Sequence, residues 1–153
     1  MVKLLFSYSH RDEAFRDELE IHLTALKRQG IISTWHDRRI VAGEDFGEEI
    51  NENLEQADMM LLLVSHYFIA SEYCYEKEMK RALERHQAGE AIVIPVILSP
   101  FDWHDMPFGK LLACPKDGKS ISKFPDMNDG FLEVTKSVKQ AAKKINSSQA
   151  PVE

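Results

Sequence analysis

Hydroxyl-bearing, aromatic and charged side chains directly follow three short apolar runs of the sequence. They occupy the segments Ser7-Tyr8-Ser9-His10, Trp35-His36-Asp37-Arg38 and Ser65-His66. If the apolar runs are parallel strands of one sheet, these segments leave it at the carboxyl ends of the strands, where open α/β sheets bind their ligands. Such groups could bind a polar ligand that contains rings.

Several common catalytic motifs are absent or incomplete. The stretch Asp117–Ser120 resembles the end of a phosphate-binding P-loop, but Ala113 stands where the motif needs a glycine. No strand-like run is followed by G-x-G-x-x-G, no G-x-S-x-G occurs, and the histidines lack metal-ligand spacing. A response regulator needs acidic residues after the first strand and an aspartate ending the third, and both runs end in other residues. We therefore expect neither a metal site nor a phosphate-accepting aspartate.

The length and composition are those of one globular domain. The chain has 153 residues, 44% of them hydrophobic and 29% charged, and domains cluster near about 100–150 residues. We expect residues 1–146 to form the domain and residues 147–153 to be a flexible tail or a linker to a domain not present. The net charge of −6 argues against nucleic acid as a partner.

The cysteine content and hydropathy indicate a cytoplasmic protein. Cys74 and Cys114 lie far apart and suit a reducing compartment better than a disulfide framework. The longest apolar run, Met59–Val64, is too short to span a bilayer, and the amino terminus lacks the pattern of a signal peptide. We expect no membrane partner.

Short apolar runs alternate with helical patterns along the chain. The runs fit strands that are buried on both faces, and they lie at residues 4–8, 31–35, 59–64 and 91–94. Apolar residues three and four apart predict helices between them, the first capped by Ser9-x-x-Asp12 and closed by Gly30. The order predicts an α/β fold, a three-layer flavodoxin-like sandwich of about five parallel strands with helices on both faces.

The segment after the fourth strand has the least regular pattern. We expect a fifth strand near Lys119–Ser122 and a short helix around Phe108–Leu112. Pro95 predicts a bulge or an early end of the fourth strand, because proline cannot donate a ladder hydrogen bond.

Five groups of residues, in order and over nearly the whole chain from Lys3 to Ile145, resemble the signature boxes of Toll/interleukin-1 receptor (TIR) domains. The run Tyr73–Glu78 is most similar to that of bacterial members. The boxes are Phe6-Ser7-Tyr8-Ser9 with Asp12; Trp35-x-Asp37-Arg38-x-Ile40-x-x-Gly43; Leu63-Val64-Ser65-x-x-Phe68; Ser71-x-Tyr73-Cys74 with Glu78; and Ile94-Pro95-Val96.

The resemblance implies one of two functions. The first is that of the NAD-cleaving TIR domains of antiphage defence: an NAD⁺ glycohydrolase, activated by self-assembly, that gives nicotinamide and ADP-ribose or a cyclic ADP-ribose. NAD⁺ would be the substrate, and no cofactor is expected. The alternative is a non-catalytic scaffold that acts through homotypic TIR–TIR association, with a sensor domain or partner protein as a further partner. A nucleoside-processing enzyme of similar architecture would need an acid–base constellation that the sequence lacks.

The enzymatic members carry a glutamate early in the third helix, four residues after an aromatic or cysteine position. Counting four residues from Tyr73 leads to Lys77, whereas counting from Cys74 leads to the candidate catalytic residue, Glu78. Loss of nicotinamide leaves positive charge on the ribose, and one carboxylate near the sugar can stabilise that charge. Without the resemblance, the helical pattern favours a solvated surface residue at Glu78, paired with Lys77 or Arg81.

The resemblance also implies a set of substrate-binding residues. The loop from Asp37 to Asp45 resembles one that mediates assembly and gates the site in relatives, although its polar content also fits an ordinary surface loop. Trp35 fits the hydrophobic core equally well. The candidates are Phe6, Ser7, Tyr8, Ser9, Trp35, Asp37, Arg38, Gly43, Asp45, Ser65 and Cys74.

Overall fold

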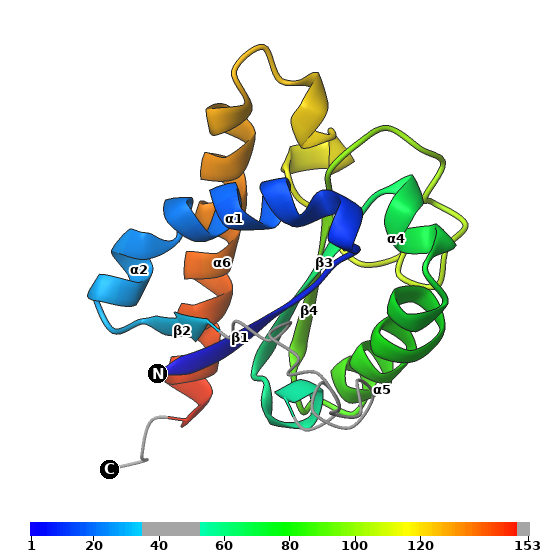
Figure 1. Ribbon diagram of the computed structural model, residues 1–153. Helices are drawn as coiled ribbons and strands as arrows, with labels where there is room; N and C mark the ends of the chain where they lie inside the picture. The colour runs from blue at the N-terminus through cyan, green and yellow to red at the C-terminus, as the bar shows by residue number, and fades with distance from the viewer. Residues whose placement is uncertain (35–52, 150–153) are drawn as a thin grey trace, which may run out of the picture.

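A single parallel sheet forms the centre of the computed structural model, which describes residues 1–34 and 53–149 (Figure 1). Four strands lie in the order β2-β1-β3-β4. Every neighbouring pair is parallel, so each connection must cross over the sheet. The strands are β1 (Val2–Ser7), β2 (Ile32–Thr34), β3 (Met59–Val64) and β4 (Ile92–Ile97).

The two central strands are buried on both faces. Along β1, Leu4 and Phe6 pack into one hydrophobic core, whereas Leu5 packs into a second core on the other side. Along β3, Leu61 packs into the first core and Leu62 into the second. Because successive side chains of a strand point to opposite faces, a stretch that is buried on both faces needs apolar residues at successive positions, which explains the runs Leu4–Phe6 and Met59–Val64.

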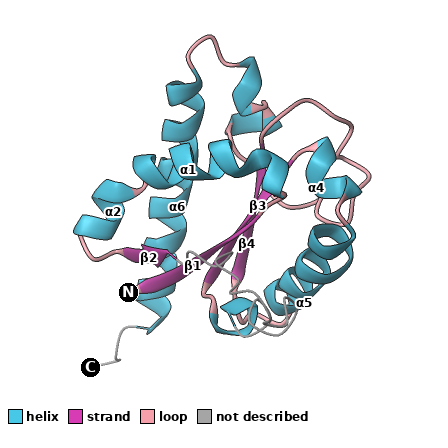
Figure 2. Cartoon of the chain, in the orientation of Figure 1, coloured by secondary structure: helices cyan, strands magenta, loops and turns pink. Residues whose placement is uncertain are grey.

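Helices cover both faces and complete a three-layer sandwich, as Figure 2 shows. The predicted α/β class and its parallel sheet are thereby confirmed. One face carries α1 (Glu13–His22), α2 (Thr24–Arg28) and α6 (Met127–Gln149). The other carries α4 (His66–Ala70), the π-helix η2 (Tyr73–Met79) and α5 (Lys80–Gln87).

Gly30 closes the first helical region, as predicted. Its φ of 73° lies in the left-handed region, which glycine adopts without a Cβ penalty. The backbone N–H of Gly30 donates to Lys27 O, and that of Ile31 donates to Leu26 O. These bonds satisfy carbonyls at the helix end and turn the chain into β2.

The predicted fifth strand is wrong. Residues 121–123 form a short 3-10 helix, η4 (Ile121–Lys123), and another, η3, spans Lys116–Gly118. A single parallel bridge between Val96 and Cys114 lies at this edge instead. In the described part of the chain the sheet therefore ends at β4, next to one bridging residue.

Pro95 neither bulges nor ends its strand, contrary to expectation. It pairs with Leu62 in the middle of β4, and its carbonyl accepts a hydrogen bond from the N–H of Cys114 (2.9 Å) on the other side. The N and O of a strand residue face the same side, so the missing N–H of Pro95 falls at the sheet edge, away from β3. Proline is tolerated at such positions.

The segment around Phe108–Leu112 is a series of turns rather than the expected short helix. Its hydrogen bonds join residues three apart, such as Gly109 N to Met106 O (2.8 Å) and Leu111 N to Phe108 O (3.0 Å). Phe108 is buried and anchors the segment to the second core, whereas Leu112 is 94% exposed. No helix within residues 1–34 and 53–149 has the length and hydropathy needed to cross a membrane.

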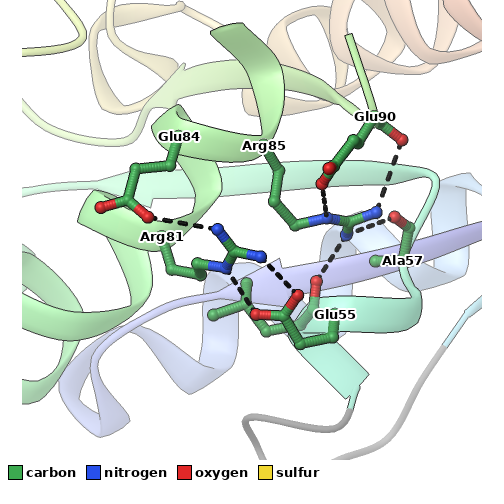
Figure 3. Close-up of polar contacts among 7 residues, drawn as sticks. Glu55, Ala57, Arg81, Glu84, Arg85 and Glu90 are labelled. Carbon is green, nitrogen blue, oxygen red and sulfur yellow. Dashed lines mark hydrogen bonds and ion pairs between the residues drawn. The ribbon is translucent and has the colours of Figure 1, made fainter. Parts of the chain in front are cut away.

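A buried arginine holds the chain where it enters β3 (Figure 3). The Nη1 atom of Arg85, on α5, donates to the carbonyls of Leu54 (2.6 Å) and Ala57 (2.8 Å). Its side chain is 8% exposed. One turn earlier, Arg81 pairs with Glu55 through side chains that are 40% and 47% exposed. Both arginines thus join α5 to the segment that leads into β3, Arg85 inside the protein and Arg81 at its surface.

Candidate functional site

The carboxyl end of β1 carries three of the candidate substrate-binding residues in buried positions. Phe6, Ser7 and Tyr8 are 4%, 1% and 6% exposed, and Ser9, just beyond, is half-buried. The hydroxyl of Ser7 is buried and has no hydrogen-bond partner among the described residues. A buried polar atom without a partner costs stability, so this hydroxyl is a feature that folding alone does not explain.

Ser9 caps the short 3-10 helix η1 (His10–Asp12) through a hydrogen bond from Arg11 N to its Oγ (3.3 Å). Ser9 thus caps this region as Ser9-x-x-Asp12 predicts, whereas Asp12, the second member of the predicted box, makes no capping bond with its side chain. Asp12 is 4% exposed and instead accepts a hydrogen bond from the hydroxyl of Ser65.

Ser65 lies at the carboxyl end of β3 and begins the next helix. Its Oγ accepts from the backbone N–H of Phe68 (3.2 Å) and so caps α4, in the manner preferred for serine. Its own proton is donated to Asp12. One buried hydroxyl therefore connects α4 to the turn that follows β1.

Burial raises the pKa of Asp12 above the usual range of an aspartate. The hydrogen bond from Ser65 and the nearby His66 both lower the pKa, but the loss of hydration outweighs them. Because the charged form is the one disfavoured by burial, the folded protein binds a proton at Asp12 more tightly than the unfolded chain does.

Replacing Asp12 with asparagine is expected to flatten part of the pH dependence of folding. Because Asp12 binds its proton more tightly in the folded protein, it contributes stability that is fully present at pH values below the unfolded pKa, about 3.9. That contribution is lost as the pH rises through the pKa of the folded state. The free energy of unfolding of Asp12→Asn should therefore increase relative to wild type between pH 3 and pH 7. Urea titrations of both proteins across this range measure the difference, and parallel pH curves would contradict the expected effect.

The π-helix η2 carries Cys74 and Glu78 on its buried side. Both residues are nearly inaccessible, at 1% and 2% exposure, and Met79 beside them is also buried. A π-helix closes hydrogen bonds between residues five apart, and its wider turn brings side chains four and five apart onto one face. The rare geometry thus turns Cys74, Glu78 and Met79 inward together.

Two hydrogen bonds anchor the first turn of η2. The thiol of Cys74 donates to the carbonyl of Tyr8 (3.3 Å), at the end of β1. The backbone N–H of Cys74 donates to Ser71 Oγ (3.2 Å). These bonds fix the helix one turn before Glu78 and hold it against the carboxyl edge of the sheet.

Glu78 is not the solvated residue that the helical pattern alone favours. The neighbouring glutamates Glu72, Glu76 and Glu84, by contrast, are exposed. Arg81, considered as an alternative partner of Glu78, is engaged by Glu55 (2.5 Å) and Glu84 (3.2 Å).

The structure brings together the candidates from β1, β3 and η2. Direct contacts link Tyr8 to Cys74, and Ser65 to the turn after β1. The remaining candidates lie outside the described residues, and these are Trp35, Asp37, Arg38, Gly43 and Asp45.

Two features of this region could not be read from the sequence. Asp12 reads as a helix cap, and only the fold reveals Ser65, 53 positions away, as its partner. The sequence indicated this pair only by placing a carboxylate and a hydroxyl after two buried strands of the same parallel sheet. The π-helix had no signal, because the spacing of Tyr75, Met79 and Leu83 fits an α-helix equally well.

Two surface hollows lie elsewhere. One of about 360 Å³ is lined mainly by residues of η2 and α5, including Tyr75, Met79 and Leu83. Another of about 370 Å³ adjoins Asp58 and Lys144. Glu78 lines neither. No cluster of three or more histidine, cysteine or acidic residues in the described ranges could hold a metal ion.

Comparisons with known proteins identify the family. The family model described as TIR domain matches residues 5–124. The protein y4lF of Sinorhizobium fredii, itself uncharacterized, is 56% identical over 152 residues, which is 99% of this chain and 47% of the relative. The chain thus spans about half the length of that relative.

A solved structure supports the same fold. The TIR domains of the activated Roq1 resistosome, which directly recognises the pathogen effector XopQ, superpose with a TM-score of 0.52. The match covers 94% of this chain and 84% of that chain at 20% identity, so it concerns the fold. With the family model covering most of the chain, these matches lead to one conclusion: the chain belongs to the TIR domain family.

Proposed function

We propose that this TIR domain is an NAD⁺ glycohydrolase that cleaves the bond between nicotinamide and ribose, with Glu78 as the catalytic residue. The observation that carries the proposal is the position of Glu78. The residue is 2% exposed and lies one π-helical turn after Cys74, whose thiol bonds to the carbonyl of Tyr8 just beyond the carboxyl end of β1. Glutamate side chains are almost never fully buried unless they are paired, and buried carboxylates cluster at functional sites.

The chemistry needs little more than a positioned negative charge. The C1′–N bond breaks, its electron pair leaves with neutral nicotinamide, and positive charge develops on the ribose. A carboxylate in a site of low dielectric stabilises this charge more strongly than water would. The oxygen of water then bonds to C1′ and its proton is released, giving ADP-ribose. If an atom of the adenine reaches C1′ first, a cyclic ADP-ribose forms instead.

The groups at the carboxyl end of β1 supply polar contacts for the substrate. The hydroxyl of Ser7 has no hydrogen-bond partner among the residues that the structure describes, which supports a role in binding, since a substrate group would supply such a bond. Phe6 lies in the same strand, Tyr8 and Ser9 follow it, and we include Ser65 and Cys74, which contact the turn after this strand, in the proposed site. We include Trp35, Asp37, Arg38, Gly43 and Asp45 in the proposed site on the family resemblance.

We further propose that the domain works in the cytoplasm and is activated by association with other TIR domains, in antiviral signalling. The relative y4lF is about twice as long as this chain, which leaves room for a sensor domain in such a protein. Exposed apolar side chains such as Ile21 (65%) and Leu112 (94%) are compatible with contacts to another domain, although single exposed apolar residues are also common on monomers. The same side chains would also suit a non-catalytic scaffold, which is the alternative function.

A concentration series with NAD⁺ separates the two functions. Proton NMR follows the nicotinamide signals and identifies the second product, while light scattering follows self-association of the same samples. The enzyme is expected to release nicotinamide at a rate per molecule that rises with protein concentration. Self-association without any nicotinamide release would support the scaffold instead.

A further inference from the structure

A buried carboxylate–hydroxyl pair joins the two loops that flank the proposed site. Asp12 ends the β1–α1 loop, defined here as Tyr8–Asp12, and Ser65 begins the path from β3 to η2. Both side chains are almost inaccessible, with exposures of 4% for Asp12 and 1% for Ser65. Their hydrogen bond is therefore shielded from water, in an environment where such a bond is stronger than at the surface.

The hydroxyl of Ser65 is oriented by both of its contacts. A serine hydroxyl has one proton to donate and two lone pairs. The proton goes to Asp12, and one lone pair accepts the N–H of Phe68 (3.2 Å). The contact with Asp12 therefore ties the β1–α1 loop to the first turn of α4.

A second contact joins the same two parts of the chain. The thiol of Cys74 donates to the carbonyl of Tyr8 (3.3 Å), at the other end of the β1–α1 loop. The loop is thus attached at both ends to the segment that runs from Ser65 through α4 into η2. Glu78 belongs to that segment, and Ser7 and Ser9 lie on or beside the loop.

We propose that Asp12 is a positioning residue: by accepting the hydrogen bond of Ser65, it fixes the β1–α1 loop relative to η2, and so sets the position of the substrate-binding groups relative to the carboxylate of Glu78. The inference rests on the proposed NAD⁺ cleavage, which it deepens. Asp12 acts through Ser65 and does not touch the substrate. A displacement of about 1 Å between substrate and catalytic group can reduce a rate about 100-fold, so one buried contact can control turnover.

Three single variants and one double variant test the role of Asp12. Asp12→Asn keeps an oxygen that accepts the Ser65 proton, whereas Asp12→Ala and Ser65→Ala remove the bond. We expect kcat for nicotinamide release to fall about 10–100-fold in both alanine variants and to stay within about threefold of wild type in Asp12→Asn. The double variant, which combines Asp12→Ala with Ser65→Ala, should be no slower than the slower of these two single variants, because the two residues act as one unit.

Asp58→Ala is the matched control. The carboxylate of Asp58 also accepts a single hydrogen bond, from the backbone N–H of Lys3 (2.9 Å), but at the opposite end of the sheet. It should leave kcat unchanged. All variants are assayed at a temperature where urea titrations show them fully folded, so that loss of stability cannot imitate loss of turnover. An Asp12→Ala protein with wild-type kcat, or an Asp12→Asn protein as slow as Asp12→Ala, would overturn the proposal.

A second measurement does not depend on turnover. In ¹H–¹⁵N spectra, the backbone amides of the β1–α1 loop and of η2 should both shift in Asp12→Ala and keep their wild-type positions in Asp12→Asn. Unchanged η2 amides in Asp12→Ala would contradict the positioning role even if the protein proves to be a scaffold. Absence of nicotinamide release from wild type, with the expected amide shifts, would instead count against the proposed function alone.

Discussion

Arg85→Ala is expected to lower the free energy of unfolding by about 2–5 kcal/mol, because it leaves two buried carbonyl groups without their donor. The guanidinium donates to Leu54 O (2.6 Å) and Ala57 O (2.8 Å) from a side chain that is 8% exposed. These carbonyls lie at the end of a helical stretch, where backbone acceptors have no partner within the helix. The loss is measured by urea titration, with an unchanged m value.

Arg81→Ala provides the matched comparison for Arg85. It lies one turn away on the same helix and removes an equally large, charged side chain. Its contacts with Glu55 and Glu84 are at the surface, where ion pairs are screened by water and contribute little. We expect a much smaller loss of stability than for Arg85→Ala. Equal losses for the two variants would show that the carbonyl contacts are not the source of the effect.

Glu78→Gln is expected to lower the rate of nicotinamide release about 100- to 1,000-fold, the effect of removing one group that stabilises transition-state charge. Glutamine keeps the size and shape of the side chain but not the negative charge that the ribosyl cation needs. The loss should fall on kcat more than on KM, because the cation exists only near the transition state. Initial rates over a range of NAD⁺ concentrations give both constants.

The architecture of the core could be predicted from the sequence because burial dictates it directly. A strand covered on both faces needs apolar residues at every position, and β3 shows this in Met59–Val64, where every residue is buried. Gly30 was equally predictable, since the left-handed turn after α2 favours glycine. These features depend on neighbours in the chain or on burial alone.

The edge of the sheet could not be predicted in the same way. Pro95 interrupts a ladder only if its missing N–H faces another strand, and that depends on which side of β4 is covered. The expected fifth strand near Lys119–Ser122 does not form, and the neighbour of Val96 is Cys114 instead. Both outcomes are decided by tertiary pairing, which local patterns do not contain.

The candidate site could also be predicted from the sequence only in part. Glu78 was found by its spacing from Cys74 within a recognisable box, and its burial could not be read from the helical pattern because η2 winds as a π-helix. Asp12 was visible as a residue but not as the partner of Ser65. Contacts between residues so far apart in the chain require the fold.

The most direct test of the proposed catalytic role is nicotinamide release from NAD⁺ by wild type, Glu78→Gln and Glu84→Gln at the same protein concentration. Glu84 is exposed on the neighbouring helix α5, so its variant controls for the loss of one charge. We predict that Glu84→Gln releases nicotinamide at the wild-type rate and that release by Glu78→Gln is slower by about two orders of magnitude or more. Equal release by all three proteins would contradict the assignment of Glu78.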